Sequence, residues 1–303
     1  HNYVDVDSDT LSRPMAEYYM PRQNHHLRAR ALYQHALVLN RKGVDHLAEA
    51  MLMLIEAEKS LAKVDDVKLE GLVHRAKADI YSEGCLFANA LESYTKAKEC
   101  FDRCKSEYHS AYVLYDMGAT YIQLRDHQKA HETLGEALDY AIRTSSAGFM
   151  AAVLHELLDL TIYMHDYELC RKYLDMFQSD GCAQFGKAHL MSMEAMLLSR
   201  EGKKSEEGVE WADLEYAHYI VYRNCGDSAK ALEWEERSRN AQDKMMVDVL
   251  RQPVLNLQIE MLQSNLEAEH RERQLVRQRN TIIYIGIFLL IVAGVYFAWR
   301  RIK

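Results

Sequence analysis

The chain has 303 residues, of which 49% are apolar and 27% are charged, so it can build a packed core and is not intrinsically disordered. It contains only three Pro and 13 Gly. An all-β sandwich or barrel needs turn residues about every 8–12 positions, so this composition excludes that class. Long helices joined by short loops are the expected architecture.

The formal net charge is −8, and it is unevenly distributed. Residues 251–303 carry 8 basic and 4 acidic side chains, which leaves a net charge of −12 for residues 1–250. An acidic body argues against a surface that binds phosphates, and we expect no nucleic-acid partner. The basic end lies beside an apolar stretch, which favours a membrane surface instead.

Residues 1–24 read as a polar N-terminal tail. Asp5, Asp7 and Asp9 imitate the start of a calcium loop, but Thr10 and Ala16 stand where that loop needs Gly and Glu. The six Cys are too sparse for a disulfide framework and form no CxxC pair. We therefore expect neither a metal nor another cofactor.

A pattern of paired helices fills residues 25–245. In residues 111–138 a short polar break separates two helical patterns, and Gly118 and Ala130 are the small residues expected to face one another where the helices cross. The same spacing recurs at intervals of about 40 residues. Its small or apolar positions in the other copies are Ala36, Ala48, Ala78, Ala90, Leu158, Cys170 and, in a last, weaker copy whose inter-helix turn is Gly226-Asp227, Ala231.

The segments NALESYTKAKECF (89–101) and YDMGATYIQLRDHQKAHETLGEAL (115–138) carry a family signature. With them the sequence resembles the tetratricopeptide repeat (TPR) family. The resemblance implies an all-α solenoid of TPR-like helix pairs that binds other proteins. A repeat of about 40 residues exceeds the usual length of about 34, and the repeat-ending Pro is missing, which implies longer helices.

The resemblance also implies which residues bind a partner. In stacked helix pairs the first helices line a concave groove. The family's groove positions fall in this sequence on Tyr33 and Asn40, Arg75 and Asp79, Tyr112 and Tyr115, and His155 and Asp159. Such a mixture of aromatic and polar side chains suits a protein or peptide ligand. The alternative is that pairs such as Arg75–Asp79 are ordinary surface pairs within one helix.

Residues 246–280 are predicted to form a helical stalk. Leu255, Ile259, Leu262 and Leu266 follow the rhythm of a short coiled-coil seam. The stalk either pairs with a second copy, giving a homodimer, or packs back on the repeats. Residues 281–299 are apolar without a charge, which predicts one C-terminal transmembrane helix, followed by a basic tail at 300–303.

Two hypotheses for function follow. The order of the segments along the chain, with repeats followed by a stalk and an apolar segment, resembles that of membrane-anchored TPR regulators of the Bacteroidetes. That resemblance implies a single-pass sensor or scaffold in signal transduction, with an extracytoplasmic (periplasmic) repeat domain. The alternative is a tail-anchored adaptor with a cytosolic repeat domain.

We do not expect an enzyme. The chain has no Walker loop and no GxGxxG or GxSxG motif. His155-Glu156 begins like a zincin helix, but Asp159 stands where that motif needs its second His.

Overall fold

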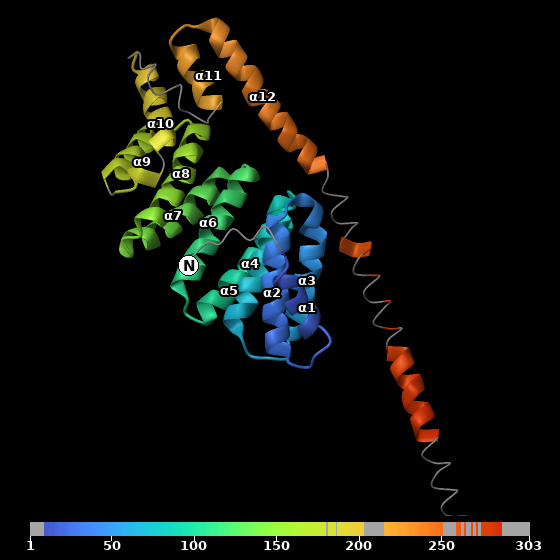
Figure 1. Ribbon diagram of the computed structural model, residues 1–303. Helices are drawn as coiled ribbons and strands as arrows, with labels where there is room; N and C mark the ends of the chain where they lie inside the picture. Colours follow the sequence, from blue (N-terminus) through green and yellow to red (C-terminus); the bar gives the residue numbers. More distant parts are fainter. Residues whose placement is uncertain are drawn as a thin grey trace, which may run out of the picture. The chain divides into compact units, whose positions relative to one another are not determined.

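The computed structural model describes residues 9–179, 181–185, 187–202, 215–250, 259–261, 264, 268, 271 and 274–286 (Figure 1). The chain divides into two compact units, residues 1–253 and residues 254–303. Helices α1 to α12 all lie within the first unit.

The first unit is built from helices in sequence order. Consecutive helices pack on one another as pairs, α2 on α3, α4 on α5, α6 on α7, α8 on α9 and α11 on α12 (Figure 1). The all-α repeat solenoid predicted from the sequence is therefore confirmed. The helices are α1 (Ser12–Tyr19), α2 (His25–Arg41), η1 (Val44–His46), α3 (Leu47–Leu61), α4 (Val67–Glu83), α5 (Phe87–Arg103), α6 (Glu107–Gln123), α7 (His127–Arg143), α8 (Ala147–Tyr163), α9 (Tyr167–Ser179), η2 (Ala183–Phe185), α10 (Lys187–Arg200), α11 (Glu215–Asn224) and α12 (Ser228–Leu250).

The repeat of 40 residues consists of two equal halves. Helices α4 to α8 are each 17 residues long, and a turn of the same form follows each of them. The middle residue of each turn has a left-handed backbone, with φ between +50° and +57°. These residues are Cys85, Lys105, Arg125, Ser145 and His165.

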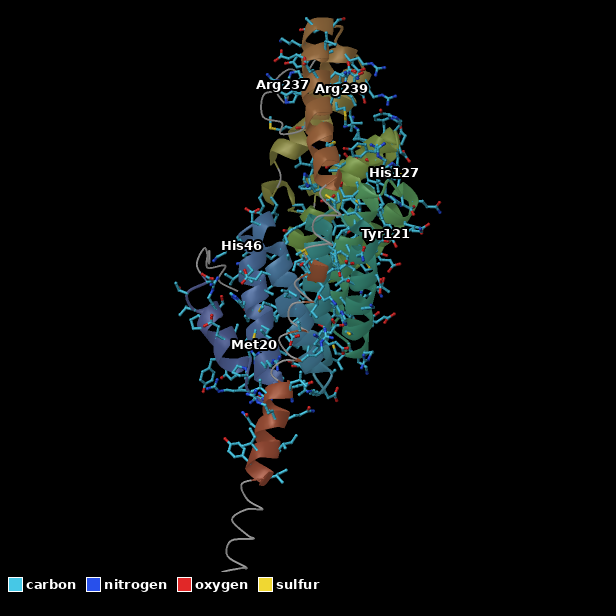
Figure 2. All side chains as sticks on the ribbon, turned by 90° about the vertical axis from the view of Figure 1, so that its right-hand side faces the viewer. Met20, His46, Tyr121, His127, Arg237 and Arg239 are labelled. Atoms are coloured by element: carbon cyan, nitrogen blue, oxygen red, sulfur yellow. The ribbon has the colours of Figure 1, made fainter. Side chains whose placement is uncertain are left out.

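Each of these turns closes the preceding helix in the same way. The N–H of Ser106 donates to the carbonyl of Phe101 at 2.8 Å, and the N–H of Asp126 donates to that of Tyr121 at 3.0 Å. This bond satisfies a carbonyl that the helix end would otherwise leave without a partner. A left-handed residue thus ends each helix, which explains how the repeats stop without Pro. Figure 2 labels Tyr121 and His127 on the two sides of one such turn.

Aspartates begin several of the helices. The side chains of Asp66, Asp126, Asp166 and Asp227 each accept the N–H of the residue three positions later, at 3.0 to 3.3 Å. Such caps satisfy one of the free N–H groups of the first turn and contribute about 1 kcal/mol each. Local sequence therefore determines where these helices begin and end.

The crossing of α6 and α7 differs in detail from the sequence prediction. Gly118 was expected to face Ala130, but a Cβ atom added at Gly118 would lie 2.5 Å from Cγ of Leu134. Leu134 is one turn further along α7 than Ala130, and both are fully buried. The small residue does permit a close crossing, and a large side chain, rather than a second small one, fills the space.

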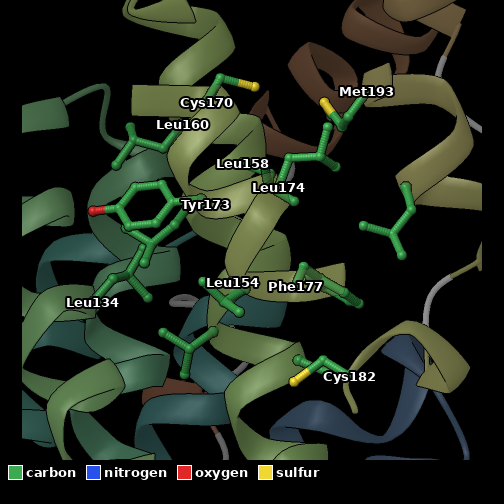
Figure 3. Packing of buried hydrophobic residues seen from close by; sticks show 14 of the residues in the cluster. Leu134, Leu154, Leu158, Leu160, Cys170, Tyr173, Leu174, Phe177, Cys182 and Met193 are labelled. Atoms are coloured by element: carbon green, nitrogen blue, oxygen red, sulfur yellow. The ribbon is translucent and has the colours of Figure 1, made fainter. Parts of the chain in front are cut away.

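A continuous core joins the later helices. Leu154 and Leu158 from α8 meet Leu174 and Phe177 from α9, and Met193 from α10 packs against the same cluster (Figure 3). All five side chains are at most 2% exposed. Since α8 packs on both α7 and α9, this core extends from one helix pair to the next.

The prediction of a transmembrane helix at 281–299 is wrong. No helix among the residues that the structure describes is long and apolar enough to cross a bilayer. Within the predicted segment, residues 281–286 are helical, whereas residues 287–303, including the basic tail, lie outside the described residues. The single-pass membrane localisation, in either orientation, and the lipid bilayer as a partner depended on this helix and are withdrawn with it.

The predicted stalk lies mostly outside the described residues. Helix α12 includes its first residues, 246–250, and residues 274–286 are helical in the second unit. Of the four predicted seam residues only Ile259 is described. The coiled coil, the homodimer and the domain boundaries remain predictions.

Candidate protein-binding face on the first helices

Four of the predicted contact residues occupy one equivalent position. Tyr33, Arg75, Tyr115 and His155 are each the ninth residue of their helix, α2, α4, α6 and α8. These helices are the first members of their pairs, and side chains link each of them to the next. We call the following set the first-helix face: Tyr33, Asn40, Arg75, Asp79, Tyr112, Tyr115, Asp116, His155, Glu156 and Asp159.

Between α4 and α6 the link is an ion pair. Arg75 Nε donates to Oδ2 of Asp116 at 2.7 Å, and the guanidinium carbon lies 5.8 Å from the centre of the Tyr112 ring. Arg75 thus pairs with the next helix rather than with Asp79 on its own helix. Asp79 instead accepts a hydrogen bond from the Tyr94 hydroxyl of α5 at 2.8 Å.

Burial governs the electrostatics of this cluster. It raises the pKa values of both Asp79 and Asp116, although the Arg75 guanidinium acts in the opposite direction. Burial also raises the pKa of Tyr94, and the neighbouring Asp79 raises it further, so its hydroxyl stays a donor. The charge of Arg75 therefore acts on both half-buried carboxylates, although its ion pair is with Asp116, and the Tyr94 hydroxyl donates to Asp79.

Between α6 and α8 the same geometry recurs with different chemistry. Tyr115 Oη donates to Oε1 of Glu156 at 3.4 Å, and the two residues are 41 positions apart, as Arg75 and Asp116 are. Burial raises the pKa of Glu156. Burial, and then the charge of Glu156, raise the pKa of Asp159 to about 7. The neutral phenol of Tyr115 thus occupies, between α6 and α8, the position that the cation of Arg75 occupies between α4 and α6.

His155 and Asp159 lie one turn apart on α8. The His155 side chain reaches solvent, and its partial burial lowers the pKa of the imidazole. Asp159 is largely covered by its surroundings. The two residues therefore share one side of α8 with Glu156.

The α2 end of the face is less connected. Asn40 Nδ2 donates to Oε1 of Glu83 at 2.8 Å, close to the ends of α2 and α4. Burial raises the pKa of Tyr33, and the charges of Arg75 and Asp79 both act on its hydroxyl. Tyr33 therefore belongs to the Arg75 cluster, whereas Asn40 takes part in a separate contact.

A ladder of aromatic rings lies beside the charged groups. The Tyr112 ring stacks on that of Phe149 with centres 4.2 Å apart, and the Tyr108 ring lies 4.7 Å from that of Tyr112. Tyr108 is 54% exposed, whereas Phe149 is 4% exposed. The ladder therefore runs from the solvent into the core and anchors Tyr112 within the face.

Sequence reasoning missed two members of this face and two residues that contact it. Asp116, Glu156, Glu83 and Tyr94 supply the partners of the predicted residues, and none of them was a predicted contact. A signal was present, because Arg75–Asp116 and Tyr115–Glu156 have the same separation, one residue longer than the repeat. No group of His, Cys, Asp and Glu within the described part of the chain is placed to hold a metal ion.

Comparisons with known proteins identify the fold. No family model matches the chain, and no curated protein matches it either. A Rap protein, solved in complex with Competence and Sporulation Factor, is similar with a TM-score of 0.51 at 15% identity, over 84% of this chain and 80% of that one. The chain has a TPR-like repeat fold.

Two further structures are also similar. BtubC from P. vanneervenii gives a TM-score of 0.48 at 17% identity, covering 77% of this chain and 86% of that one. A Podospora anserina kinesin light chain with TPR-like repeats gives 0.45 at 16% identity, covering 72% and 96%. The similarity to the Rap protein confirms the TPR resemblance as a fold. The comparisons do not show the Bacteroidetes membrane-anchored type or a role in signal transduction.

Proposed function

We propose that this protein is a protein-binding repeat scaffold that holds a peptide or protein segment along its first-helix face. The observation that carries the proposal is the row of equivalent side chains Tyr33, Arg75, Tyr115 and His155, which four successive first helices present. A row with the spacing of the repeats suits a ligand that extends along several repeats.

The face is organised before any ligand binds. Arg75 is fixed by its ion pair with Asp116, and Tyr112 is fixed by its stacking on Phe149. Side chains that are already held in place lose little conformational freedom on binding, so more of the contact energy appears as affinity. Their partial exposure leaves surface for a partner to cover.

The fold supports the same role. The Rap protein with a similar fold was solved with Competence and Sporulation Factor bound, so this architecture is compatible with capturing a second molecule. The absence of a Walker loop, GxGxxG or GxSxG in the sequence agrees with a scaffold rather than an enzyme.

Selection from a library of displayed random peptides tests the proposal on the full chain. Individual enriched peptides are then measured by fluorescence anisotropy against the unchanged protein and against Tyr108→Ala and His155→Ala. Both side chains are exposed, so neither change should disturb the core. We expect binding to weaken by about tenfold, which is the loss of one good contact.

Glu136→Ala is the matched control, because Glu136 is exposed on the second helix α7. It should leave the affinity unchanged, and thermal melts should show all three variants folded. The proposal fails if no peptide is enriched, or if enriched peptides bind Y108A and H155A as tightly as the original chain.

A further inference from the structure

The part of the first-helix face on α6 and α8 has a chemistry that narrows the class of ligand. We propose that it receives the Lys or Arg side chain of an extended peptide, held between Tyr115, Glu156 and Asp159. This inference depends on the proposed function and adds the charge of the ligand to it.

The protein contains its own template for such a contact. At the preceding step, the Arg75 guanidinium occupies the ninth position of α4 and binds the carboxylate at the tenth position of α6, Asp116. At the next step the tenth position again holds a carboxylate, Glu156, but the ninth holds Tyr115. The acidic half of the motif is repeated, and the basic half is left for a partner to supply.

A second carboxylate, that of Asp159, adds negative charge beside Glu156 at the contact between α6 and α8. Asp159 lies one turn beyond Glu156 on α8, and the charge of Glu156 disfavours the ionised form of Asp159. A cationic side chain placed between the two would offset this repulsion, and burial strengthens a charge-assisted hydrogen bond.

The neighbouring aromatic rings fit the same ligand. A guanidinium or an ammonium group is attracted to the face of a tyrosine ring, and Arg75 already lies over Tyr112 in this way. The exposed Tyr108 continues the aromatic surface beside it. The net charge of −12 on residues 1–250 adds a long-range attraction for a basic partner.

Fluorescein-labelled peptide pools test the inference with the full chain. Each pool is randomised with neutral residues around one fixed central residue, which is Arg, citrulline or Glu. Citrulline has the shape of Arg without its charge. We expect the Arg pool to bind about tenfold more tightly than the citrulline pool, and the Glu pool to bind least.

The double variant E156Q/D159N removes the two charges with little change in shape. It should reduce binding of the Arg pool to the level of the citrulline pool. The matched control E132Q/E136Q removes two exposed charges on α7, and it should leave the preference for Arg intact. This control separates a local contact from the general attraction of an acidic protein.

The outcomes distinguish this inference from the proposed function. Equal binding of the Arg and citrulline pools, or an unchanged preference in E156Q/D159N, would overturn the cationic contact while peptide binding itself stands. Absence of binding by every pool would overturn both. An equal loss in the two double variants would show only a long-range effect of net charge, and it would also overturn the contact.

Discussion

Gly118 of α6 lies directly against Leu134 of α7. A Cβ atom at Gly118 would be 2.5 Å from Cγ and 2.7 Å from Cδ2 of Leu134, much closer than carbon atoms pack. Leu134 is fully buried, so its side chain is enclosed by other core residues. The separation of the two helices is therefore set by a hydrogen atom on one side and an isobutyl group on the other.

Gly118→Ala should destabilise the protein by about 1–3 kcal/mol, because the added methyl group overpacks a buried crossing. Denaturant unfolding followed by circular dichroism measures the change. Gly135→Ala is the control, since Gly135 lies within α7 and a Cβ atom there would meet nothing within 4 Å. That change should stabilise by about 0.5–1 kcal/mol through helix propensity. Equal effects of the two substitutions would contradict the close crossing.

Arg75→Met should destabilise the protein by about 2–4 kcal/mol at pH 8, because it leaves the half-buried carboxylate of Asp116 without its cation. Loss of Arg75 raises the folded-state pKa of Asp116 further, so the penalty should shrink as the pH falls and the carboxylate takes up a proton.

The second substitution D116N in the same chain should restore most of that stability. A double-mutant cycle then gives the coupling between the two side chains. Additive effects of R75M and D116N would show that the pair seen at 2.7 Å contributes nothing.

Asp159→Asn should change how stability depends on pH. Burial and Glu156 raise the pKa of Asp159 from 3.8 to about 7, so between these values the folded chain holds a proton that the unfolded chain releases. Asp159 therefore makes stability decrease as the pH rises from about 4 to about 7.

The variant should accordingly resemble the original chain at pH 4 and exceed its unfolding free energy by about 1–3 kcal/mol at pH 8. Urea titrations at the two pH values measure the difference. Asp139→Asn, on the exposed side of α7, is the control and should shift both curves equally. A D159N effect that is the same at both pH values would argue against the raised pKa.

Arg125→Gly should stabilise the protein by about 1 kcal/mol. Arg125 has a φ of +57°, a conformation in which a Cβ atom is strained and glycine is not. Gln128→Gly, three residues later in the first turn of α7, should instead cost up to about 1 kcal/mol, because its backbone is helical. Thermal melts of the two variants should therefore shift in opposite directions, and a shared direction would contradict the role of the turn.

The regular features of the fold could be predicted because each has a local cause. Small residues such as Ala90 and Ala130 recur at the repeat distance, and both are fully buried. The partner of Gly118 could not be predicted, because a shift of one turn along α7 replaces Ala130 by Leu134 without changing the periodicity. Sequence periodicity identifies a helix face but does not fix the register between two helices.

In the candidate site, too, the helix that carries a residue could be predicted, whereas the partner of that residue could not. Placing Arg75 and Asp79 on a first helix follows from the repeat alone, but their partners come from neighbouring helices. Arg75 pairs with Asp116 of α6 rather than with Asp79 of its own helix. The reason is that the adjacent first helices α4 and α6 bring Arg75 Nε to within 2.7 Å of Asp116 Oδ2. The predicted membrane localisation is wrong. It was inferred from the apolar sequence of residues 281–299, but no described helix is long and apolar enough to span a bilayer.

The identical lengths of α4 to α8 and their shared turn have a consequence for how such a chain can evolve. Between residues 67 and 163 every twentieth residue returns to the same point of the helix–turn cycle. A duplication or deletion of 40 residues in this stretch would rejoin one helix to its counterpart in phase, whichever residue the break falls on. The protein could thus gain or lose a docking position by recombination within its own gene, without a new linker having to arise.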